Sequence, residues 1–503
     1  MNKKKIFDIF IIGGGINGCG IARDASGRGL QVCLAEMGDI GSGTSSASTK
    51  LIHGGLRYLK YFDFKLVRES LKEREVLLKN MPHICWPMRF ILPAPTNLFQ
   101  RILVRLGLLI YDNLGGRTIL LGTKTFKSKN TNIASLLKNK FSSVFVFSDC
   151  WVEDSRLVIL NAVDAKKRGA SILTHTKVTD FKNEKKYWRI TTQNSLGQIQ
   201  EFLSYSIVNA SGPWVNTINH QASADGDTIN LVKGSHLVFN KLFEHDSSYF
   251  LLGNDGRIIF LIPFQGDFTL VGTTEVPHEN ILEDPKCSPL EKGYLIEFVN
   301  QYFNFDLKLE NIVWSYSGIR PLYKDSKKKK GSVSSITRDY KLKLDTFEGL
   351  PILNIYGGKL TTYRKLSENV LLKLNPYFTK MKKPWTSGKP LPGGDFDMID
   401  KSLLIQKLSE KYCFLNDKWC RRLINCYGTL SEAILEKSET KEDLGIDFGH
   451  SLTEAEVIWL INNEFASCAE DILWRRTKLG LKFSRNEEKK LSDWFKNAST
   501  KLV

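Results

Sequence analysis

A glycine-rich turn near the N-terminus constrains the fold of this chain more than any other feature. An apolar stretch, residues 6–12, ends abruptly in Gly13-x-Gly15-x-x-Gly18, as a buried parallel strand entering a tight turn would. The first glycine permits the turn, the second lets the backbone approach a pyrophosphate, and the third allows a helix to pack closely on the strand. We therefore expect a helix over about residues 15–29 and an α/β domain built around this unit.

An acidic residue after the second strand indicates which nucleotide the turn would bind. Residues 31–35 form another apolar stretch, and Glu36 follows where a carboxylate accepts hydrogen bonds from the adenosine ribose. That carboxylate would repel a ribose 2′-phosphate, so NADP is disfavoured. The loop that follows, residues 41–50, is rich in Gly, Ser and Thr and runs into residues 51–58. Such a loop can wrap a pyrophosphate and lead to an isoalloxazine ring, which favours FAD over NAD.

Length, composition and charge limit the remaining classes of protein. With 503 residues, 42% of them hydrophobic, the chain is long enough for two or three packed domains. A formal net charge of +17 favours acidic partners such as anionic lipid, phosphorylated metabolites or nucleic acid, without choosing among them. The nine cysteines have neither metal-ligand nor redox spacing, so we predict reduced thiols in a cytosol and no metal site.

Four blocks of sequence are spread over most of the chain. They are residues 11–18 (IIGGGING), 44–59 (TSSASTKLIHGGLRYL), 316–322 (YSGIRPL) with 336–340 (ITRDY), and 356–365 (YGGKLTTYRK). In these blocks the sequence resembles the FAD-dependent glycerol-3-phosphate dehydrogenases, which are membrane-associated respiratory enzymes. The resemblance covers nearly the whole chain. It implies an α/β fold with an FAD-binding Rossmann-like domain of the glutathione-reductase and D-amino-acid-oxidase type, an antiparallel-sheet substrate domain and a C-terminal helical domain.

The chain is expected to alternate between two domains before a third begins. The FAD-binding domain takes three segments, about 1–90, 145–220 and 350–383. The substrate domain takes the two segments between them, about 91–144 and 221–349, where short alternating runs suit an antiparallel sheet over the cofactor. A linker rich in Pro and Gly follows residue 384, and a helical domain is expected to fill residues 384–503.

The predicted cofactor site draws on three of the four matched blocks and on residues between them. Small residues at 210–212 would let the backbone lie against the cofactor. A glycine pair before an expected helix, residues 360–370, would direct backbone amides and the helix dipole at a reduced flavin. The residues expected to contact FAD are Gly13, Gly15, Asn17, Gly18, Glu36, Thr44, Ser45, Ser48, Lys50, Leu51, His53, Val178, Ala210, Gly212, Trp214, Gly358, Lys359, Leu360 and Thr361.

Three arginines inside the matched blocks are candidates for binding a phosphate ester. Such an ester carries close to two negative charges, and paired guanidinium hydrogen bonds hold it in one orientation. Arg320 has the best claim because it lies in an otherwise apolar segment, where an unpaired charge would be costly. We expect a substrate site formed by Arg57, Tyr58, Arg320, Arg338 and Lys359.

Two histidines are candidates for the proton transfer that accompanies oxidation of a secondary alcohol. A base must take the hydroxyl proton while a hydride passes to the flavin. His236, expected at the start of a strand, is our candidate base, and His53 is expected to pack beside the flavin. Arg320 would polarise the developing ketone. A purely structural role for either histidine stays open, as it does for Tyr58.

The resemblance implies oxidation of sn-glycerol 3-phosphate to dihydroxyacetone phosphate, with the electrons passed to a membrane quinone. Three alternatives stay open. One is a glycerophosphate oxidase that reduces oxygen to hydrogen peroxide, another is an amino-acid oxidase on the same fold, and the third is a non-catalytic flavin-binding membrane protein. The oligomeric state is also open, with a homodimer as one option, and nucleic acid is not an expected partner.

A long apolar segment suggests where the protein would meet a membrane. Residues 98–114 are almost wholly apolar, and Arg101, Arg105 and Asp112 fall on one face of the expected helix. Such a helix suits a lipid interface, with an ordinary buried helix as the alternative. No run of 18 uncharged apolar residues occurs in the sequence, so we expect a cytoplasmic protein held peripherally at the inner face of the cytoplasmic membrane.

Overall fold

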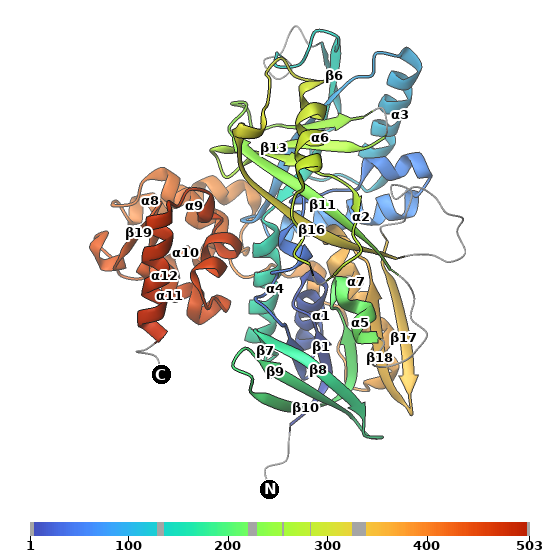
Figure 1. The fold of residues 1–503 in the computed structure, drawn as a ribbon, viewed down its shortest axis with the longest axis vertical. Helices are drawn as coiled ribbons and strands as arrows, with labels where there is room; N and C mark the ends of the chain where they lie inside the picture. Colours follow the sequence, from blue (N-terminus) through green and yellow to red (C-terminus); the bar gives the residue numbers. More distant parts are fainter. Residues whose placement is uncertain are drawn as a thin grey trace.

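Two large β-sheets lie one above the other in the computed structural model, and a helical C-terminal domain packs against one side of them (Figure 1). The structure describes residues 5–127, 135–219, 229–253, 256–281, 283–323 and 339–499. Arg338, predicted to bind substrate, lies outside these residues. This arrangement confirms the expected α/β architecture with a second, largely antiparallel sheet and a helical C-terminal part.

The first sheet has eight strands and is built around the strand that precedes the glycine turn. That strand, β1 (Ile6–Ile12), lies parallel between β2 (Val32–Ala35) and β10 (Ile199–Asn209). It is almost wholly buried because helices cover the sheet, as a parallel arrangement requires. The remaining strands are β7 (Ser171–Leu173), β8 (Thr176–Asn183), β9 (Trp188–Asn194), β17 (Lys341–Phe347) and β18 (Leu350–Tyr356).

Three helices form the layer against this sheet and come from distant parts of the chain. They are α1 (Ile16–Gly27), α4 (Asp154–Lys167) and α7 (Tyr363–Leu374), and α1 packs between the other two. The predicted helix at 15–29 is therefore correct in place and two residues too long at its end. It ends early because Gly29 adopts a positive φ of 88°, a conformation that glycine accepts without strain.

The second sheet has ten strands and is antiparallel except where β4 and β12 pair in parallel. Its longest pairing joins β11 to β16, and both strands carry predicted site residues. The strands are β3 (Leu51–Ile52), β4 (Cys85–Pro93), β5 (Lys124–Lys127), β6 (Ser143–Val152), β11 (Ile229–Asn240), β12 (Ser248–Leu252), β13 (Ile258–Phe264), β14 (Phe268–Gly272), β15 (Val276–Pro277) and β16 (Ile312–Tyr323).

The two sheets divide the chain differently from the predicted boundaries at four strands. Strand β3 lies in a segment assigned to the FAD-binding domain but belongs to the second sheet, and β17 lies in a segment assigned to the substrate domain but belongs to the first. Strand β4 falls mostly in the segment assigned to the FAD-binding domain, and so does β6, yet both belong to the second sheet. Strand β6 is buried on both faces, and such a continuous apolar run looks like a parallel strand in the sequence. Its antiparallel pairing with β4 over nine residue pairs decides its place.

Four more helices complete this part of the chain. Helix α6 (Pro289–Asn300) starts at a capping box made by Ser288 and Glu291, and α2 (Phe64–Asn80) starts at Asp63, whose side chain accepts a hydrogen bond from the Leu66 amide. The other two are α3 (Leu98–Leu114) and the short α5 (Val215–Asn219). The bounds of α3 are those predicted from its apolar pattern.

The C-terminal domain has its own hydrophobic core, which includes the buried side chains of Trp419, Leu460 and Leu491. Its helices are α8 (Lys401–Lys411), α9 (Asp417–Tyr427), α10 (Ser431–Leu435), α11 (Glu454–Glu464) and α12 (Arg485–Ser499), with a π-helical turn at Asp471–Arg476 and a small hairpin of β19 (Asp447–Gly449) and β20 (Leu452–Thr453).

Candidate active site

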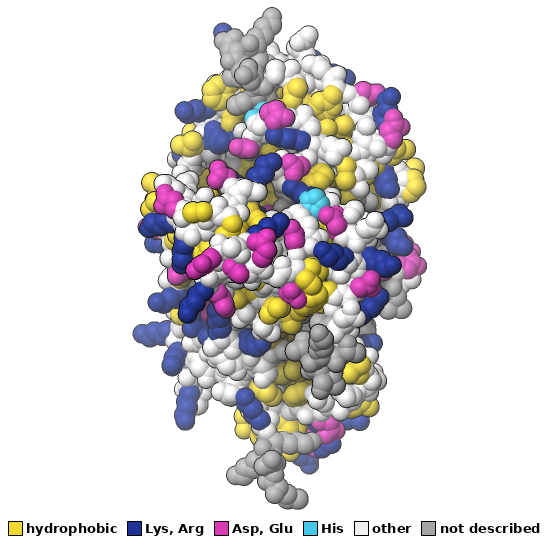
Figure 2. All heavy atoms as spheres, turned by 90° about the vertical axis from the view of Figure 1, so that its left-hand side faces the viewer, with side chains coloured by type: hydrophobic (Ala, Val, Ile, Leu, Met, Phe, Trp, Pro, Cys, Tyr) yellow, Lys and Arg dark blue, Asp and Glu magenta, His cyan; other side chains and the backbone are white. Residues whose placement is uncertain are grey.

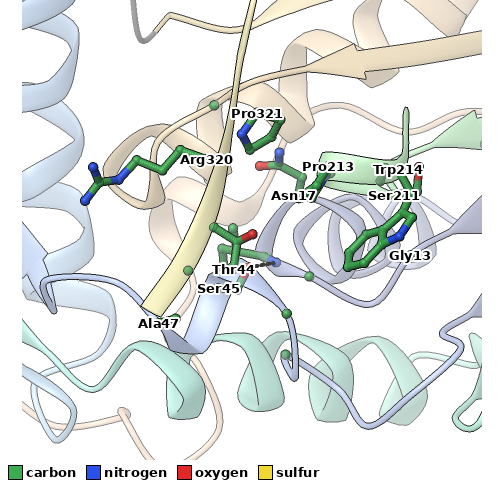
Figure 3. A pocket seen from close by; sticks show the side chains of 18 of the residues that line it. Gly13, Asn17, Thr44, Ser45, Ala47, Ser211, Pro213, Trp214, Arg320 and Pro321 are labelled. Atoms are coloured by element: carbon green, nitrogen blue, oxygen red, sulfur yellow. Dashed lines mark hydrogen bonds between the residues drawn. The ribbon is translucent and has the colours of Figure 1, made fainter. Parts of the chain in front are cut away.

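A cavity of about 740 Å³ lies between the two sheets and extends from the glycine turn to Arg320. In Figure 3, Gly13 and Trp214 lie at one end and Arg320 at the other, with Thr44 and Asn17 between them. Of the predicted cofactor residues, Gly18 is the one that does not line this cavity. Arg320, Tyr58 and Lys359 line it as well. The matched sequence blocks therefore meet at one site.

The three glycines of the turn have different surroundings. A Cβ on Gly18 would lie 1.9 Å from the Gly13 carbonyl oxygen, and a Cβ on Gly13 would lie 2.6 Å from the Ala210 oxygen. Gly13 also has a positive φ of 107°. A Cβ on Gly15 would meet the Ser45 hydroxyl at 3.2 Å and would otherwise point into open space. Packing therefore requires the first and third glycines, whereas the second keeps the cavity open.

Glu36 is held at the adenosine end by two backbone amides. Its carboxylate accepts hydrogen bonds from the Gly14 amide at 2.6 Å and from the Gly38 amide at 2.9 Å. Burial raises the pKa of Glu36, and the two amide hydrogen bonds oppose that rise. The side chain lines the cavity where the sequence predicts a contact with a ribose.

The loop rich in Gly, Ser and Thr is fastened to helix α1, which packs on the first sheet, and to strand β16 of the second sheet. The Ser45 hydroxyl accepts a hydrogen bond from the Ile16 amide at the start of α1, at 3.0 Å. The Thr44 hydroxyl donates to the Ile319 carbonyl of β16 at 2.6 Å. Because the loop bridges the sheets, it fixes the separation between the cofactor end and the Arg320 end of the cavity.

Ser48 and Lys50, both predicted to bind the cofactor, line the cavity and direct their side-chain polar groups at Asp154. Lys50 Nζ lies 2.8 Å from each oxygen of that carboxylate, and the Ser48 hydroxyl donates to it at 2.7 Å. Asp154 is fully buried in the first turn of α4, which is a favourable place for a negative charge. Both residues border the cavity, but their side chains serve mainly to hold the loop in shape.

The segment at residues 357–361 lines the cavity and follows β18, whose C-terminal end lies at the same edge of the first sheet as the glycine turn. Gly357 and Gly358 have φ values of 74° and 111°. Asn17 of α1 donates from Nδ2 to the Gly357 carbonyl at 3.3 Å. The Thr361 hydroxyl accepts from the His53 amide and donates to the His53 carbonyl, both at 3.3 Å. Segments far apart in the sequence are thereby joined at the cavity wall.

Arg320 carries the positive charge that most clearly lacks a counterpart. Its Nη2 donates to the Thr273 hydroxyl at 3.1 Å, while its buried Nη1 has no hydrogen-bond partner among the described residues. No carboxylate in the described part of the chain lies within ion-pair distance of it. Burial lowers the pKa of Arg320. A buried guanidinium with an unpaired N–H group and no nearby carboxylate favours the binding of an anion.

The other predicted substrate residues are placed unequally. Lys359 Nζ lies 4.0 Å from the centre of the Tyr58 ring, and both residues line the cavity. Arg57 is not among the lining residues, and its Nη1 lies 3.5 Å from a carboxylate oxygen of Glu275. The structure therefore brings Tyr58, Arg320 and Lys359 together at the cavity and directs Arg57 toward an ion pair.

His236 does not line the cavity, and it lies in the middle of β11 rather than at a strand start. Its side chain is fully buried and stacks on the Tyr316 ring at 4.8 Å between centres. Its Nε2 lies 2.9 Å from the hydroxyl of Thr49, which does line the cavity. Burial, followed by the charges of Arg320 and Lys50, lowers the pKa of His236 well below 6.5. The imidazole is therefore neutral and reaches the cavity through Thr49.

Thr49 and Asp154 are the site residues that the sequence did not single out. Thr49 lies inside a matched block, but the block does not indicate that it pairs with a histidine nearly 190 positions later. Asp154 lies outside the matched blocks, and only the fold brings it to the loop at residues 46–50. The sequence can indicate an acidic residue at the start of a helix, but it does not indicate which residues that acid will contact.

Comparison with known families agrees with this geometry. A family model described as FAD dependent oxidoreductase matches residues 8–362, and one described as the C-terminal domain of alpha-glycerophosphate oxidase matches residues 385–494. The chain belongs to the FAD-dependent oxidoreductase family, and FAD is its cofactor, as the glycine turn and the loop after Glu36 predict.

Relatives similar over their whole length narrow the class further. The chain is 44% identical to the D-erythritol 1-phosphate dehydrogenase of Brucella abortus, over 99% of both chains. It is 42% identical to the aerobic glycerol-3-phosphate dehydrogenase of Escherichia coli, over 97% of both, and 41% identical to the glycerol-3-phosphate dehydrogenase of Pseudomonas aeruginosa, over 98% and 96%. These relatives confirm the predicted resemblance to the FAD-dependent glycerol-3-phosphate dehydrogenases.

Solved structures show the same fold. The glycerol-3-phosphate dehydrogenase of Bacillus halodurans, complexed with FAD, superposes with a TM-score of 0.76 at 24% identity, covering 98% of this chain and 94% of that one. An L-alpha-glycerophosphate oxidase of Mycoplasma pneumoniae with bound FAD gives a TM-score of 0.62 at 18% identity, covering 76% and 98%. The cavity fits this cofactor, because a Cβ on Gly212 would meet nothing within 4 Å and Gly15 likewise leaves room for a pyrophosphate.

Proposed function

We propose that this protein oxidises sn-glycerol 3-phosphate to dihydroxyacetone phosphate. The observation that carries the proposal is the unpaired, buried Nη1 of Arg320 at the cavity, which Lys359 also lines. A dianionic phosphate ester would supply the charge that this part of the site lacks. The names of two full-length relatives support the same substrate.

In this proposal the protein supplies charge, orientation and a proton acceptor. Arg320 and Lys359 bind the phosphorylated alcohol, and Arg320 also stabilises the negative charge that develops on the oxygen as the ketone forms. The Thr49 hydroxyl takes the substrate's hydroxyl proton while it passes its own proton to Nε2 of His236. FAD, when bound in this cavity, would supply the acceptor for the hydride that leaves the carbinol carbon of the substrate. Arg338 stays a predicted phosphate ligand, from its place in a matched block.

D-Erythritol 1-phosphate is the second candidate substrate, because a relative at 44% identity carries that name. The phosphate end of the two substrates is the same, and erythritol phosphate is longer by one hydroxymethylene group. Comparison of kcat/KM for the two compounds, with release of the ketone product measured in parallel, decides between them. The glycerol 3-phosphate proposal predicts the higher kcat/KM for the three-carbon compound and fails if only the four-carbon compound is oxidised.

We also propose that α3 lies in the membrane interface and that a membrane quinone accepts the electrons. The outward face of α3 is apolar: Leu98, Phe99, Ile102, Leu103, Leu106 and Leu109 are between 50% and 69% exposed. The side that faces the protein buries Leu108 and Tyr111 together with Asp112, which accepts a hydrogen bond from the Thr123 amide at 2.7 Å. A helix whose outward face is also apolar suits a lipid interface. In the described part of the chain, no helix is long and apolar enough to cross a bilayer.

Aromatic residues next to α3 enlarge this surface. Phe62 is 79% exposed, Phe64 is also exposed, and both adjoin the helical turn at Leu56–Tyr61, which contacts α3. Lys60 and Lys65 flank them with positive charge that would attract anionic lipid. Sedimentation with anionic vesicles tests this surface. The wild-type chain should cosediment and a Leu103→Glu, Leu106→Glu double variant should not, and equal binding by both would contradict it.

The electron acceptor is tested separately from the substrate. A quinone-linked dehydrogenase yields little hydrogen peroxide per turnover and reduces an added quinone, whereas an oxidase releases about one peroxide per substrate oxidised. The C-terminal family match to alpha-glycerophosphate oxidase is the reason to measure it. Stoichiometric peroxide in air, with no acceleration by quinone, would overturn the quinone proposal while leaving the substrate intact.

A further inference from the structure

One contact between the C-terminal domain and the cofactor half of the molecule is made through a buried carboxylate. Asp39 is 3% exposed and receives hydrogen bonds from two arginines of the π-helical turn at Asp471–Arg476. Arg475 donates from Nε at 2.5 Å, and Arg476 donates from Nη1 and, at 2.8 Å, from Nη2. The side chain of Arg476 is itself fully buried. The described residues provide no other cation for Asp39.

Asp39 lies in the segment that forms the adenosine end of the cavity. Residues 36 and 37 line the cavity on one side of it, and residues 41–43 line it on the other. The Ser42 amide donates to the Asp39 carbonyl at 3.0 Å, and the Gly41 amide donates to the Gly14 carbonyl of the glycine turn at 3.0 Å. The conformation of residues 36–43 is therefore tied to the turn on one side and to the C-terminal domain on the other.

The charge of Asp39 also matters to the neighbouring carboxylate. Asp39 raises the pKa of Glu36, which shows that the two acids lie close enough to repel each other. A pyrophosphate bound at the turn would add further negative charge at this end. Arg475 and Arg476 offset the Asp39 charge, so that the segment can bear both Glu36 and an anionic cofactor.

Arg476 also takes part in a second contact between the domains. Arg476 donates from Nη2 to the Glu464 carbonyl at 2.6 Å, and the Glu464 carboxylate pairs with Arg156 of α4, where one oxygen lies 2.9 Å from Nη2. Helix α4 begins with Asp154, which holds the loop at residues 46–50. The segment at residues 36–43 is thus held directly by Arg475 and Arg476 of the C-terminal domain. The loop at residues 46–50 is held through α4, which pairs with Glu464 of the same domain.

We propose that Arg476, with Arg475, is a positioning residue for FAD, and that the C-terminal domain sets how tightly the cofactor is held by fixing Asp39. The face of that domain seen in Figure 2 does not indicate that the domain binds a charged partner instead. Basic and acidic side chains are interspersed over it rather than gathered in a patch of one charge. The inference concerns the bound cofactor and is independent of the substrate proposed above.

The test measures the rate at which FAD leaves the holoenzyme after dilution, at a temperature well below the melting temperature. The rise in fluorescence of free flavin reports this rate. Arg476→Gln should release FAD at least tenfold faster than the wild-type chain, and Asp39→Asn should also release it faster. The matched control is Arg422→Gln, because Arg422 pairs with buried Glu456 at 2.6 Å wholly within the C-terminal domain. That control should lower the melting temperature and leave FAD release unchanged.

Either of two results with Arg476→Gln would overturn the proposal. One is wild-type FAD release from Arg476→Gln, and the other is equal acceleration by Arg476→Gln and Arg422→Gln at matched loss of melting temperature, which would indicate general destabilisation. If Arg476→Gln does not fold, Arg475→Gln takes its place, since Arg475 binds the same carboxylate and is 12% exposed. Unchanged FAD release by that variant and by Asp39→Asn would also overturn it.

Discussion

Substitution of Gly15 and Gly18 by alanine should have different consequences, although both glycines belong to one motif. The change at Gly18 should lower stability, and the change at Gly15 should abolish FAD binding. A Cβ at position 18 would lie 1.9 Å from the Gly13 carbonyl oxygen and 3.1 Å from its carbon. These are backbone atoms, which no side-chain rotation can move away. Helix α1 would have to shift off β1, and overpacking of this kind costs typically 1–3 kcal/mol, with the upper end expected here. Total stability is only about 5–15 kcal/mol, so the loss is substantial.

A Cβ at position 15 meets a different situation. Its nearest neighbour is the Ser45 hydroxyl at 3.2 Å, a side chain that can adjust, and Gly15 has a φ of −76° that alanine accepts. The stability of the FAD-free protein should therefore change by less than about 1 kcal/mol. The methyl group would point into the cavity where the pyrophosphate approaches the turn, so FAD binding should be lost.

Thermal unfolding with and without added FAD separates the two effects. Gly15→Ala should melt near the temperature of the wild-type protein without FAD and should gain no stability from FAD, because ligand stabilisation follows RT ln(1 + [L]/Kd). Gly18→Ala should melt several degrees lower under both conditions. Normal FAD retention by Gly15→Ala, or a wild-type melting temperature for Gly18→Ala, would refute this account of the turn.

Three further predictions concern the site and the interface beside it. Arg320→Gln should raise KM for glycerol 3-phosphate at least tenfold in steady-state assays while the visible flavin spectrum stays normal; loss of FAD instead would make the residue a cofactor ligand. Thr49→Val should slow flavin reduction in stopped-flow experiments at least tenfold with little change in substrate affinity, whereas a normal rate would exclude the relay to His236. Burial, followed by the charge of Lys50, lowers the pKa of Lys478 from 10.5 to about 7, and the native state therefore binds fewer protons than the unfolded state between those values. Stability attributable to Lys478 rises with pH over that range, so Lys478→Met should raise the melting temperature at pH 7 and have progressively less effect toward pH 10; parallel pH profiles for the two proteins would contradict this.

Local features of the fold were predictable because each depends on neighbouring residues. The glycine turn, the carboxylate of Glu36 and the helix at Leu98–Leu114 all follow from spacing within about twenty positions. The place of β6 was not predictable in this way, because a strand buried on both faces has the same pattern in either sheet. Its partner, β4, decides the matter, and strand partners are set by the whole fold.

The candidate site shows the same division between local and long-range information. Arg320 was predictable, since an arginine in an apolar segment needs an anion. The position of His236 behind Thr49 was not, because β11 and the loop at residues 46–50 meet only in three dimensions. Ser48 and Lys50 were assigned to the cofactor because their block also carries Thr44 and Ser45, whereas Asp154 holds their polar groups.

The central claim is that a phosphorylated alcohol reduces the bound flavin, and anaerobic mixing tests it most directly. Purified holoenzyme is mixed with glycerol 3-phosphate in the absence of oxygen and of any other acceptor, and the visible absorbance of the flavin is recorded together with dihydroxyacetone phosphate. The account predicts bleaching of the flavin with one equivalent of product formed per FAD. An unchanged flavin spectrum at saturating glycerol 3-phosphate, in protein whose FAD is bleached by dithionite, would contradict it.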